Sequence, residues 1–427
     1  MANVRKLIRR MGADKLYSGS FFLMLNSFIL SGLGFAFWII CSHFFAASQI
    51  GVATALLAAL NLITSASLLG FEISVIRILP AHTDKSKLIN VCLSVAGLAG
   101  IILSIGFLKF QPLIASSLSL VRANWWVMAL FVVFTLFQTS SYIVESVLVA
   151  YQKSAFIVYK NLIFSILKVI LIAAFIGLGA FGIYSAWMVA LGIAVIYTLF
   201  VLRKQVGHKL SLSLSPKPLK GAIRYSFDNY VAAFLEGMPI MILPLMITDF
   251  QGPVANARYY MAMMLATFLF TVSESASQSL FADGSHSQTN LRQKTTKALK
   301  FVGTFLVPGI VALYLLAPLV LLVFGKTYAT TQGVLLLQLL AISAVFTSFN
   351  AIGRTLLKIR YQTGALVAID VAGCALLLGA AYIFRSHGLA AIGYSWIAGQ
   401  AFTTLLLGAV ALRYRLASEP AVSPAAV

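Results

Sequence analysis

The chain is organised as long apolar stretches separated by short polar or basic breaks. The first stretch covers residues 16–71, where no Asp, Glu, Lys or Arg occurs. As a single helix it would be about 84 Å long at about 1.5 Å per residue, whereas the hydrocarbon core of a bilayer is about 30 Å thick. The expected break lies at Ser42, His43, Ser48 and Gln49. The pattern therefore predicts two membrane spans in this stretch alone.

The same pattern continues to the end of the chain. Apolar windows of about 20 residues, bounded by charged or turn-forming residues, are typical of transmembrane helices. The predicted spans are 17–40, 49–71, 88–108, 124–150, 155–177, 182–202, 223–247, 255–281, 299–323, 331–353, 363–384 and 389–411. The sequence thus predicts an all-α integral membrane protein with twelve transmembrane helices.

The basic residues predict the orientation of these spans. With the N-terminus inside, 25 of the 31 Lys and Arg residues fall in inner segments, five fall in outer segments, and Lys168 lies within a span. Cytoplasmic loops of membrane proteins carry such an excess, and one missed span would reverse the alternation from that point on. We therefore expect both termini to be cytoplasmic.

The amino-acid composition predicts that many of the apolar residues form a lipid-facing surface. The chain is 60% hydrophobic and 10% charged, with a mean hydropathy of +0.95, whereas soluble domains have about 25% charged residues. The net charge of +20 is dispersed over many short segments. This dispersion favours contact with anionic membrane lipids and argues against nucleic acid as a partner.

The chain has two similar halves. Tyr17-Ser18 opens the first half and Tyr225-Ser226 opens the second, and a glycine-rich entry with a Trp begins both the sixth and the twelfth span. Halves of six spans share one orientation, so a pseudo-two-fold axis along the membrane normal would relate them. Such lobes form alternating-access transporters, with the substrate site near the midplane between them. The predicted parts are a six-helix lobe at 1–202, a basic cytoplasmic linker at 203–222 and a second six-helix lobe at 223–427.

Short motifs along nearly the whole chain carry a family resemblance. They are Gln49-Ile50-Gly51 and Leu69-Gly70-Phe71 at the two ends of the second span, Phe324-Gly325-Lys326-Thr327-Tyr328 as an FGxxY turn after the ninth, Gly353-Arg354 at the end of the tenth, and Gly388, Gly393 and Trp396 at the start of the twelfth. In this order and spacing the chain resembles Wzx-type polysaccharide flippases of the multidrug/oligosaccharidyl-lipid/polysaccharide exporter superfamily.

The resemblance implies a task. Such flippases carry a lipid-linked oligosaccharide, usually on undecaprenyl diphosphate, from the cytoplasmic to the outer leaflet of the bacterial inner membrane, and form no covalent bond. The implied cargo is a repeat unit of O-antigen (lipopolysaccharide), capsule or exopolysaccharide, and the implied partners are a polysaccharide polymerase and a chain-length regulator. Lipid II flippases of the same superfamily usually have basic residues on the first span, and residues 16–41 have none.

Basic residues within or beside the spans are candidates for binding the diphosphate. Lys168 lies near the middle of the fifth span, and Lys160 lies eight residues earlier, about 80° around the helix, so both can face one cavity. Their ammonium groups suit a diphosphate. Arg77 and Arg354 close spans two and ten and could meet the diphosphate as it enters. Alternatively, Lys160 extends to the interface, Lys168 pairs with an acid such as Glu145, and the arginines only anchor the topology.

Acidic residues within the spans are candidates for ion coupling, with H⁺ or Na⁺ as the coupling ion and no other cofactor. Glu236 lies near the middle of the seventh span, eight residues after Asp228, and Pro239 and Pro244 follow it. Prolines break helices next to transporter sites, and burial makes a carboxylate easier to protonate. A structural ion pair is the alternative. The other candidates are Glu274 in span eight and Asp370 in span eleven.

Two other functions stay open. A multidrug or small-cation exporter on the same fold would need an acidic, aromatic-lined cavity without a lysine near the midplane, which Lys168 opposes. A glycan polymerase or ligase would need a long outer loop with reactive residues, and every outer break here is short. We expect no enzyme and no metal site, because the sequence has no Ser-His-Asp set, P-loop or metal-ligand spacing in a usable context.

Overall fold

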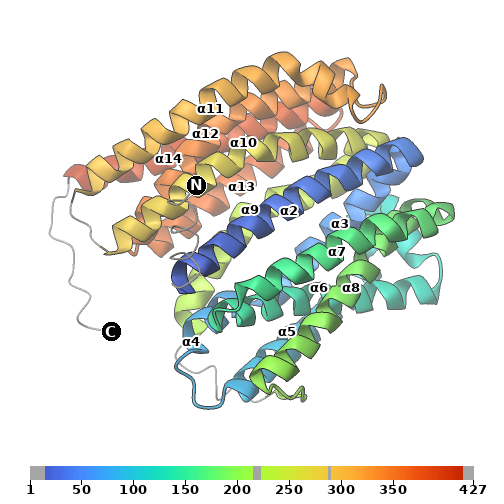
Figure 1. Ribbon diagram of the computed structural model, residues 1–427. Coiled ribbons are helices and arrows are strands. Elements are labelled where there is room, and N and C mark those ends of the chain that lie inside the picture. The colour runs from blue at the N-terminus through green and yellow to red at the C-terminus, as the bar shows by residue number, and fades with distance from the viewer. Residues whose placement is uncertain (1–14, 215–222, 287–289, 417–427) are drawn as a thin grey trace, which may run out of the picture. The chain divides into compact units, whose positions relative to one another are not determined.

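A computed structural model describes residues 15–214, 223–286 and 290–416. Each predicted span coincides with one long α-helix (Figure 1). The long helices are α2 (Lys15–Phe44), α3 (Ala47–Leu68), α5 (Lys85–Ile114), α6 (Trp125–Ala150), α7 (Ser154–Ala174), α8 (Gly179–Val206), α9 (Ile223–Gln251), α10 (Pro253–His286), α11 (Leu291–Leu322), α12 (Thr331–Ile359), α13 (Thr363–Ile383) and α14 (Gly388–Leu416). The short elements are α4 (Phe71–Ile78), η1 (Ser116–Arg122) and η2 (Ile176–Leu178).

Eleven helices of the described ranges are long and apolar enough to cross a membrane. The long helix that falls outside this set is α10, predicted as the span 255–281. Its second half carries Glu274 and Asp283 together with five Ser, one Gln and one His, and these residues lower its hydropathy. A helical, multi-span membrane protein is therefore confirmed, whereas the orientation of the termini stays a prediction.

The breaks around the second span follow from local chemistry. Helix α2 ends at Phe44 and α3 begins at Ala47, at the predicted break, where Gln49 Oε1 accepts a hydrogen bond of 3.1 Å from the backbone N–H of Ala46. The span ends at Leu68 rather than at the predicted residue 71. Leu69 and Gly70 have φ angles of 51° and 79°, and such a left-handed pair ends a helix and turns the chain.

The FGxxY turn after α11 is also built from specific contacts. The Phe324 and Tyr328 side chains are buried. Gly325 has a φ of 113°, a backbone conformation that residues other than glycine rarely adopt. The backbone N–H of Tyr328 donates to the carbonyl oxygen of Gly325 at 3.1 Å. Thr330 then caps α12 by accepting from the N–H of Gly333.

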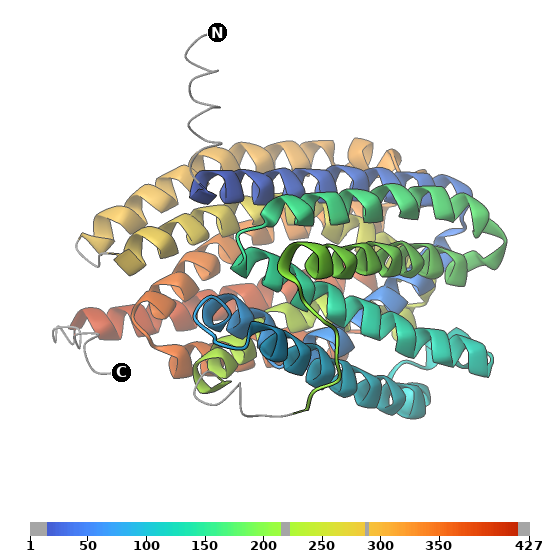
Figure 2. The ribbon, with the colours of Figure 1, turned by 60° about the horizontal axis from the view of Figure 1, so that its bottom comes forward.

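The chain divides into two compact units, residues 1–230 and 231–427. In unit 1, α7 packs against α2 and α8, and Figure 2 shows these three helices side by side. In unit 2, α12 packs against α10, α11 and α14, and α13 packs against α14. The division falls within α9, so the predicted lobes 1–202 and 223–427 and their pseudo-symmetry stay a prediction.

Candidate functional site

Charged side chains from four helices gather within unit 2. Arg354 on α12 donates from Nε to Asp370 Oδ1 on α13 at 2.9 Å, and from Nη1 to Glu236 Oε1 on α9 at 3.0 Å. Glu274 on α10 also attracts Arg354 electrostatically. We call these four residues the Arg354 cluster. The structure thus brings together four of the eight candidates that the sequence suggested.

Carboxylates outnumber cations in the Arg354 cluster, even when Lys358 on α12, which acts electrostatically on Asp370, is counted with Arg354. The side chains of Arg354 and Asp370 are 10% and 1% exposed, whereas Glu236 is 37% exposed. Asp370 Oδ2 is buried and has no hydrogen-bond partner among the described residues. A buried acceptor without a donor is unfavourable, so a proton or a small metal cation would relieve it. This arrangement suits reversible binding of a cation.

Two prolines follow Glu236 within α9. Pro239 has no N–H, so the carbonyl of Leu235 lacks its usual helical donor immediately before Glu236. Pro244 has the same effect on Ile240, one turn further along. The helix nevertheless continues from Ile223 to Gln251.

The environment of Arg354 is not the one expected of a residue at the entrance that meets the diphosphate. Its guanidinium is largely buried and is compensated by carboxylates on two sides. A phosphate bound there would compete with Glu236 and Asp370 for the guanidinium. The geometry therefore groups Arg354 with the acidic residues, and its predicted substrate-binding role stays a prediction.

A second polar network lies within unit 1 and joins α2, α6 and α7. Lys160 donates to Ser141 Oγ and forms an ion pair with Glu145 Oε1. Asn161 Nδ2 donates to Asn26 Oδ1 at 2.8 Å and to Glu145 Oε1 at 3.3 Å. Lys160 is 1% exposed, so the alternative in which it extends to the interface is wrong. Its charge is compensated by Glu145.

Lys168 is equally buried but has a different environment. It is 1% exposed, and its Nζ lies 4.2 Å from the ring centroid of Trp187 on α8, 4.7 Å from Phe164 on α7 and 5.2 Å from Phe37 on α2. The expected pair with Glu145 is formed by Lys160 instead. No ion pair to Lys168 occurs within the described part of the chain. The three rings stabilise its charge by cation–π attraction without neutralising it.

The two remaining candidates are Arg77 and Asp228. Arg77 is exposed on the short helix α4 and therefore lies beyond the end of α3. Asp228 lies on α9, but its side chain is outside the described residues. The sequence reasoning missed the rings around Lys168. Phe164, four residues before Lys168 on one helix, was a local signal, whereas Phe37 and Trp187 come from other helices.

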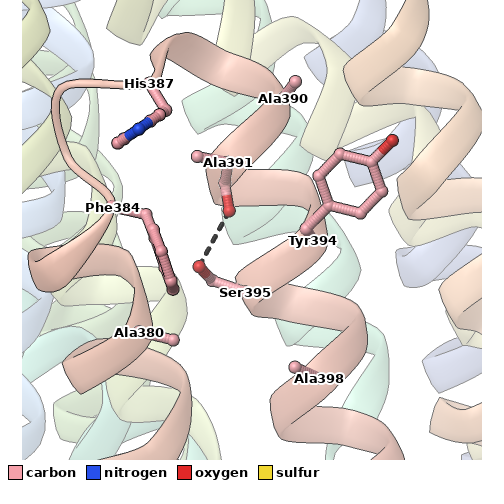
Figure 3. Close-up of a pocket in the computed structure, with 8 residues that line it drawn as sticks. All are labelled: Ala380, Phe384, His387, Ala390, Ala391, Tyr394, Ser395 and Ala398. Carbon is pink, nitrogen blue, oxygen red and sulfur yellow. Dashed lines mark hydrogen bonds between the residues drawn. The ribbon is translucent and has the colours of Figure 1, made fainter.

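A separate cavity opens between the end of α13 and the start of α14 (Figure 3). It has a volume of about 370 Å³, and Ser395 in its wall donates a hydrogen bond to the carbonyl of Ala391. Its wall is mainly apolar and includes none of the eight candidates. It therefore does not suit a diphosphate. The lining residues are Ala380, Phe384, His387, Ala390, Ala391, Tyr394, Ser395 and Ala398.

Solved transporter structures share this fold along nearly the whole chain. An inward-facing multidrug resistance MATE family transporter of the MOP superfamily matches with a TM-score of 0.67, 14% identity, and coverage of 94% of this chain and 98% of that chain. The MATE multidrug transporter DinF-BH matches with a TM-score of 0.65, 16% identity, and coverage of 94% and 95%.

A third similar structure is a MOP superfamily transporter from Pyrococcus furiosus, described as having a binding pocket of reverse polarity that suggests a different function. Its TM-score is 0.57, its identity is 15%, and coverage is 95% of this chain and 96% of that chain. No protein-family model and no curated protein matches the sequence. The chain therefore has the fold of MATE-type MOP transporters, and the similarity to Wzx-type flippases stays a prediction.

Proposed function

We propose that this protein is an alternating-access flippase that moves a polyprenyl-diphosphate-linked oligosaccharide from the cytoplasmic to the outer leaflet. The observation that carries the proposal is the contrast in charge between the surroundings of Lys168 and the Arg354 cluster. The spanning helices of unit 1 hold Lys168 as a cation without an acidic partner among the described residues, whereas the Arg354 cluster of unit 2 has a surplus of carboxylates. An anionic headgroup suits the first, and a coupling cation suits the second.

The surroundings of Lys168 would strengthen its attraction for a diphosphate. Its aromatic neighbours have replaced water around the ammonium group, and charges attract more strongly where the dielectric constant is low. Because Lys168 is 1% exposed, binding requires that the rings of Phe37 and Trp187 separate. In the proposed cycle, movement of α2 and α8 relative to α7 exposes the ammonium group to the cargo.

The Arg354 cluster would couple this movement to an ion gradient. A proton or Na⁺ bound at Glu236, or at Asp370 Oδ2, would reduce the negative charge that holds Arg354. The hydrogen bond from Arg354 to the neutralised carboxylate would then weaken, and with it the link of α12 to α9 or to α13. Cation binding in unit 2 thereby changes the relative stability of two helix arrangements, as alternating access requires.

Lys168→Met is expected to weaken binding of undecaprenyl diphosphate by about 10- to 100-fold, because a hydrogen bond to a charged group contributes about 1.5–3 kcal/mol. Methionine keeps most of the volume within the rings. Lys168→Arg should retain part of the affinity, and Lys326→Ala, an exposed basic residue of unit 2, serves as the control. Affinity can be measured by titration of the detergent-solubilised protein. Parent-like affinity of Lys168→Met would exclude this site for the diphosphate.

In the proposed topology, both termini lie on the cytoplasmic side of a bacterial inner membrane. Lys204 and Lys326 are exposed residues on predicted opposite sides, and the native residues Cys41, Cys92 and Cys374 are buried. In intact cells, Lys326→Cys should react with an impermeant thiol reagent and Lys204→Cys should be protected. The reverse pattern would contradict the orientation. A polysaccharide polymerase and a chain-length regulator are the partners we propose at the outer side.

A cation-coupled multidrug exporter is the second candidate function. The fold is similar to that of the multidrug transporter DinF-BH, and the acidic surplus in unit 2 would suit a cationic drug. Ethidium, a fluorescent organic cation, can serve as the drug probe. The two functions separate in one assay: a flippase moves the lipid-linked glycan and leaves ethidium untransported in inverted vesicles, whereas an exporter does the opposite.

A further inference from the structure

The beginning of the linker is attached to a polar stripe on α5. Ser86, Asn90 and Ser94 are spaced by four residues, so they lie on one face of the helix. Gly207 ends α8 with a φ of 70°, and residues 208–214 then run without helical structure across this face (Figure 2). We call these three α5 residues the polar stripe.

Hydrogen bonds connect the linker to the polar stripe at successive levels. They are His208 Nδ1 with Ser86 Oγ at 2.9 Å, Asn90 Nδ2 donating to the Lys209 carbonyl at 2.8 Å and to Ser211 Oγ at 2.9 Å, and the Ser213 N–H donating to Ser94 Oγ at 3.1 Å. His208 is buried, and this burial lowers the pKa of its imidazole. Residues 208–214 therefore have a defined position along α5, and the two segments run in the same direction.

The side chains between these contacts point away from α5. Leu210, Leu212 and Leu214 are 59%, 94% and 60% exposed, and they alternate with the residues that contact the polar stripe. Alternation with a period of two is the pattern of an extended chain with two different faces. We call these three residues the leucine strip. An apolar face this exposed needs an apolar environment to cover it.

The position along α5 indicates what that environment is. Helix α5 has 30 residues, so it is about 45 Å long and extends about 7 Å beyond a 30 Å hydrocarbon core at each end. Ser94 lies about 13 Å along the helix from Lys85, which is about 6 Å inside the hydrocarbon boundary. The leucine strip therefore lies at the level where headgroups meet acyl chains.

We propose that residues 208–214 form a strap that inserts into one leaflet, with the leucine strip in contact with lipid acyl chains. The polar stripe provides hydrogen bonds for backbone groups at Lys209 and Ser213, which would be costly to leave unsatisfied at this depth. The exposed basic residues Arg203, Lys204 and Lys209 lie next to the strip and suit anionic headgroups. The partner is thus the anionic leaflet itself, and the start of the linker is fixed to unit 1.

The test uses an environment-sensitive fluorophore on Leu212→Cys in vesicles that contain phosphatidylglycerol. We expect blue-shifted emission, quenching by lipids with a nitroxide near the headgroup end of the acyl chain, and several-fold weaker quenching by aqueous iodide than for the control Gln293→Cys. Gln293 is an exposed residue on α11, in a segment predicted to lie on the same side of the membrane as the linker. Equal iodide quenching at both positions would overturn the proposal. Protection from both quenchers would also overturn it, because protein rather than lipid would then cover the strip.

A second variant tests the role of the polar stripe. Ser94→Ala, placed in the labelled Leu212→Cys protein, removes the bond from the Ser213 N–H and leaves the other leucines intact. Iodide quenching of the label should rise toward that of Gln293→Cys. Unchanged iodide quenching would show that the polar stripe does not hold the strap and would overturn that part of the proposal.

Discussion

Replacing Arg354 by alanine is expected to lower the free energy of unfolding by about 3–5 kcal/mol, because removal of one partner leaves a buried charge without compensation. The group left uncompensated is Asp370, whose side chain is 1% exposed. Thermal and denaturant unfolding in detergent will measure the loss. Lys300→Ala, an exposed basic residue on α11, should change stability by less than about 0.5 kcal/mol.

The reason for the loss can be tested with a second substitution. In Arg354→Met/Asp370→Asn the buried charges of both partners are gone, so part of the stability should return. A loss below about 0.5 kcal/mol for Arg354→Ala would contradict the buried ion-pair geometry. The single variant Arg354→Met is the reference for this double variant. A double variant that is less stable than Arg354→Met would contradict the assignment of the lost stability to the uncompensated charge of Asp370.

Glu236→Gln is expected to leave a folded, inserted protein whose transport no longer responds to an imposed pH or Na⁺ gradient. Glutamine keeps an oxygen that can accept from Arg354 Nη1, but it cannot ionise. Because Glu236 is 37% exposed, the substitution should affect stability little. Rates in proteoliposomes with and without each gradient will measure the effect.

The matched control for this prediction is Asp283→Asn, which removes an exposed carboxylate on α10. It should keep a gradient-dependent rate. A Glu236→Gln protein that still responds to the gradient would assign Glu236 to structure alone, and Asp370→Asn would then be the remaining carboxylate to test within the buried part of the cluster.

The spans could be predicted from the sequence because hydrophobic length is a local property. The break before Ala47 and the turn at Phe324–Tyr328 were likewise visible in short motifs. Helix α10 fits the prediction of a membrane span less well than the other long helices, because its polar second half does not have the composition of a typical span. Its length and its packing against α11 and α12 depend on tertiary contacts.

The members of the Arg354 cluster could be predicted singly, since any charge within a span is costly and therefore informative. Their pairing could not be predicted, because Arg354 and Glu236 are 118 residues apart in sequence. For the same reason the sequence offered Glu145 to Lys168, whereas the fold pairs it with Lys160. The contacts of the linker with α5 join residues 119–122 apart and were equally hidden.

The cargo that we propose is a lipid-linked glycan. The most direct test of this proposal is transfer of a fluorescent polyprenyl-diphosphate oligosaccharide between the leaflets of proteoliposomes, read by a membrane-impermeant quencher. We predict protein-dependent transfer that an ion gradient accelerates and that Lys168→Met reduces, with ethidium left untransported. Gradient-driven transport of ethidium without any transfer of the lipid-linked glycan would exclude the proposed cargo.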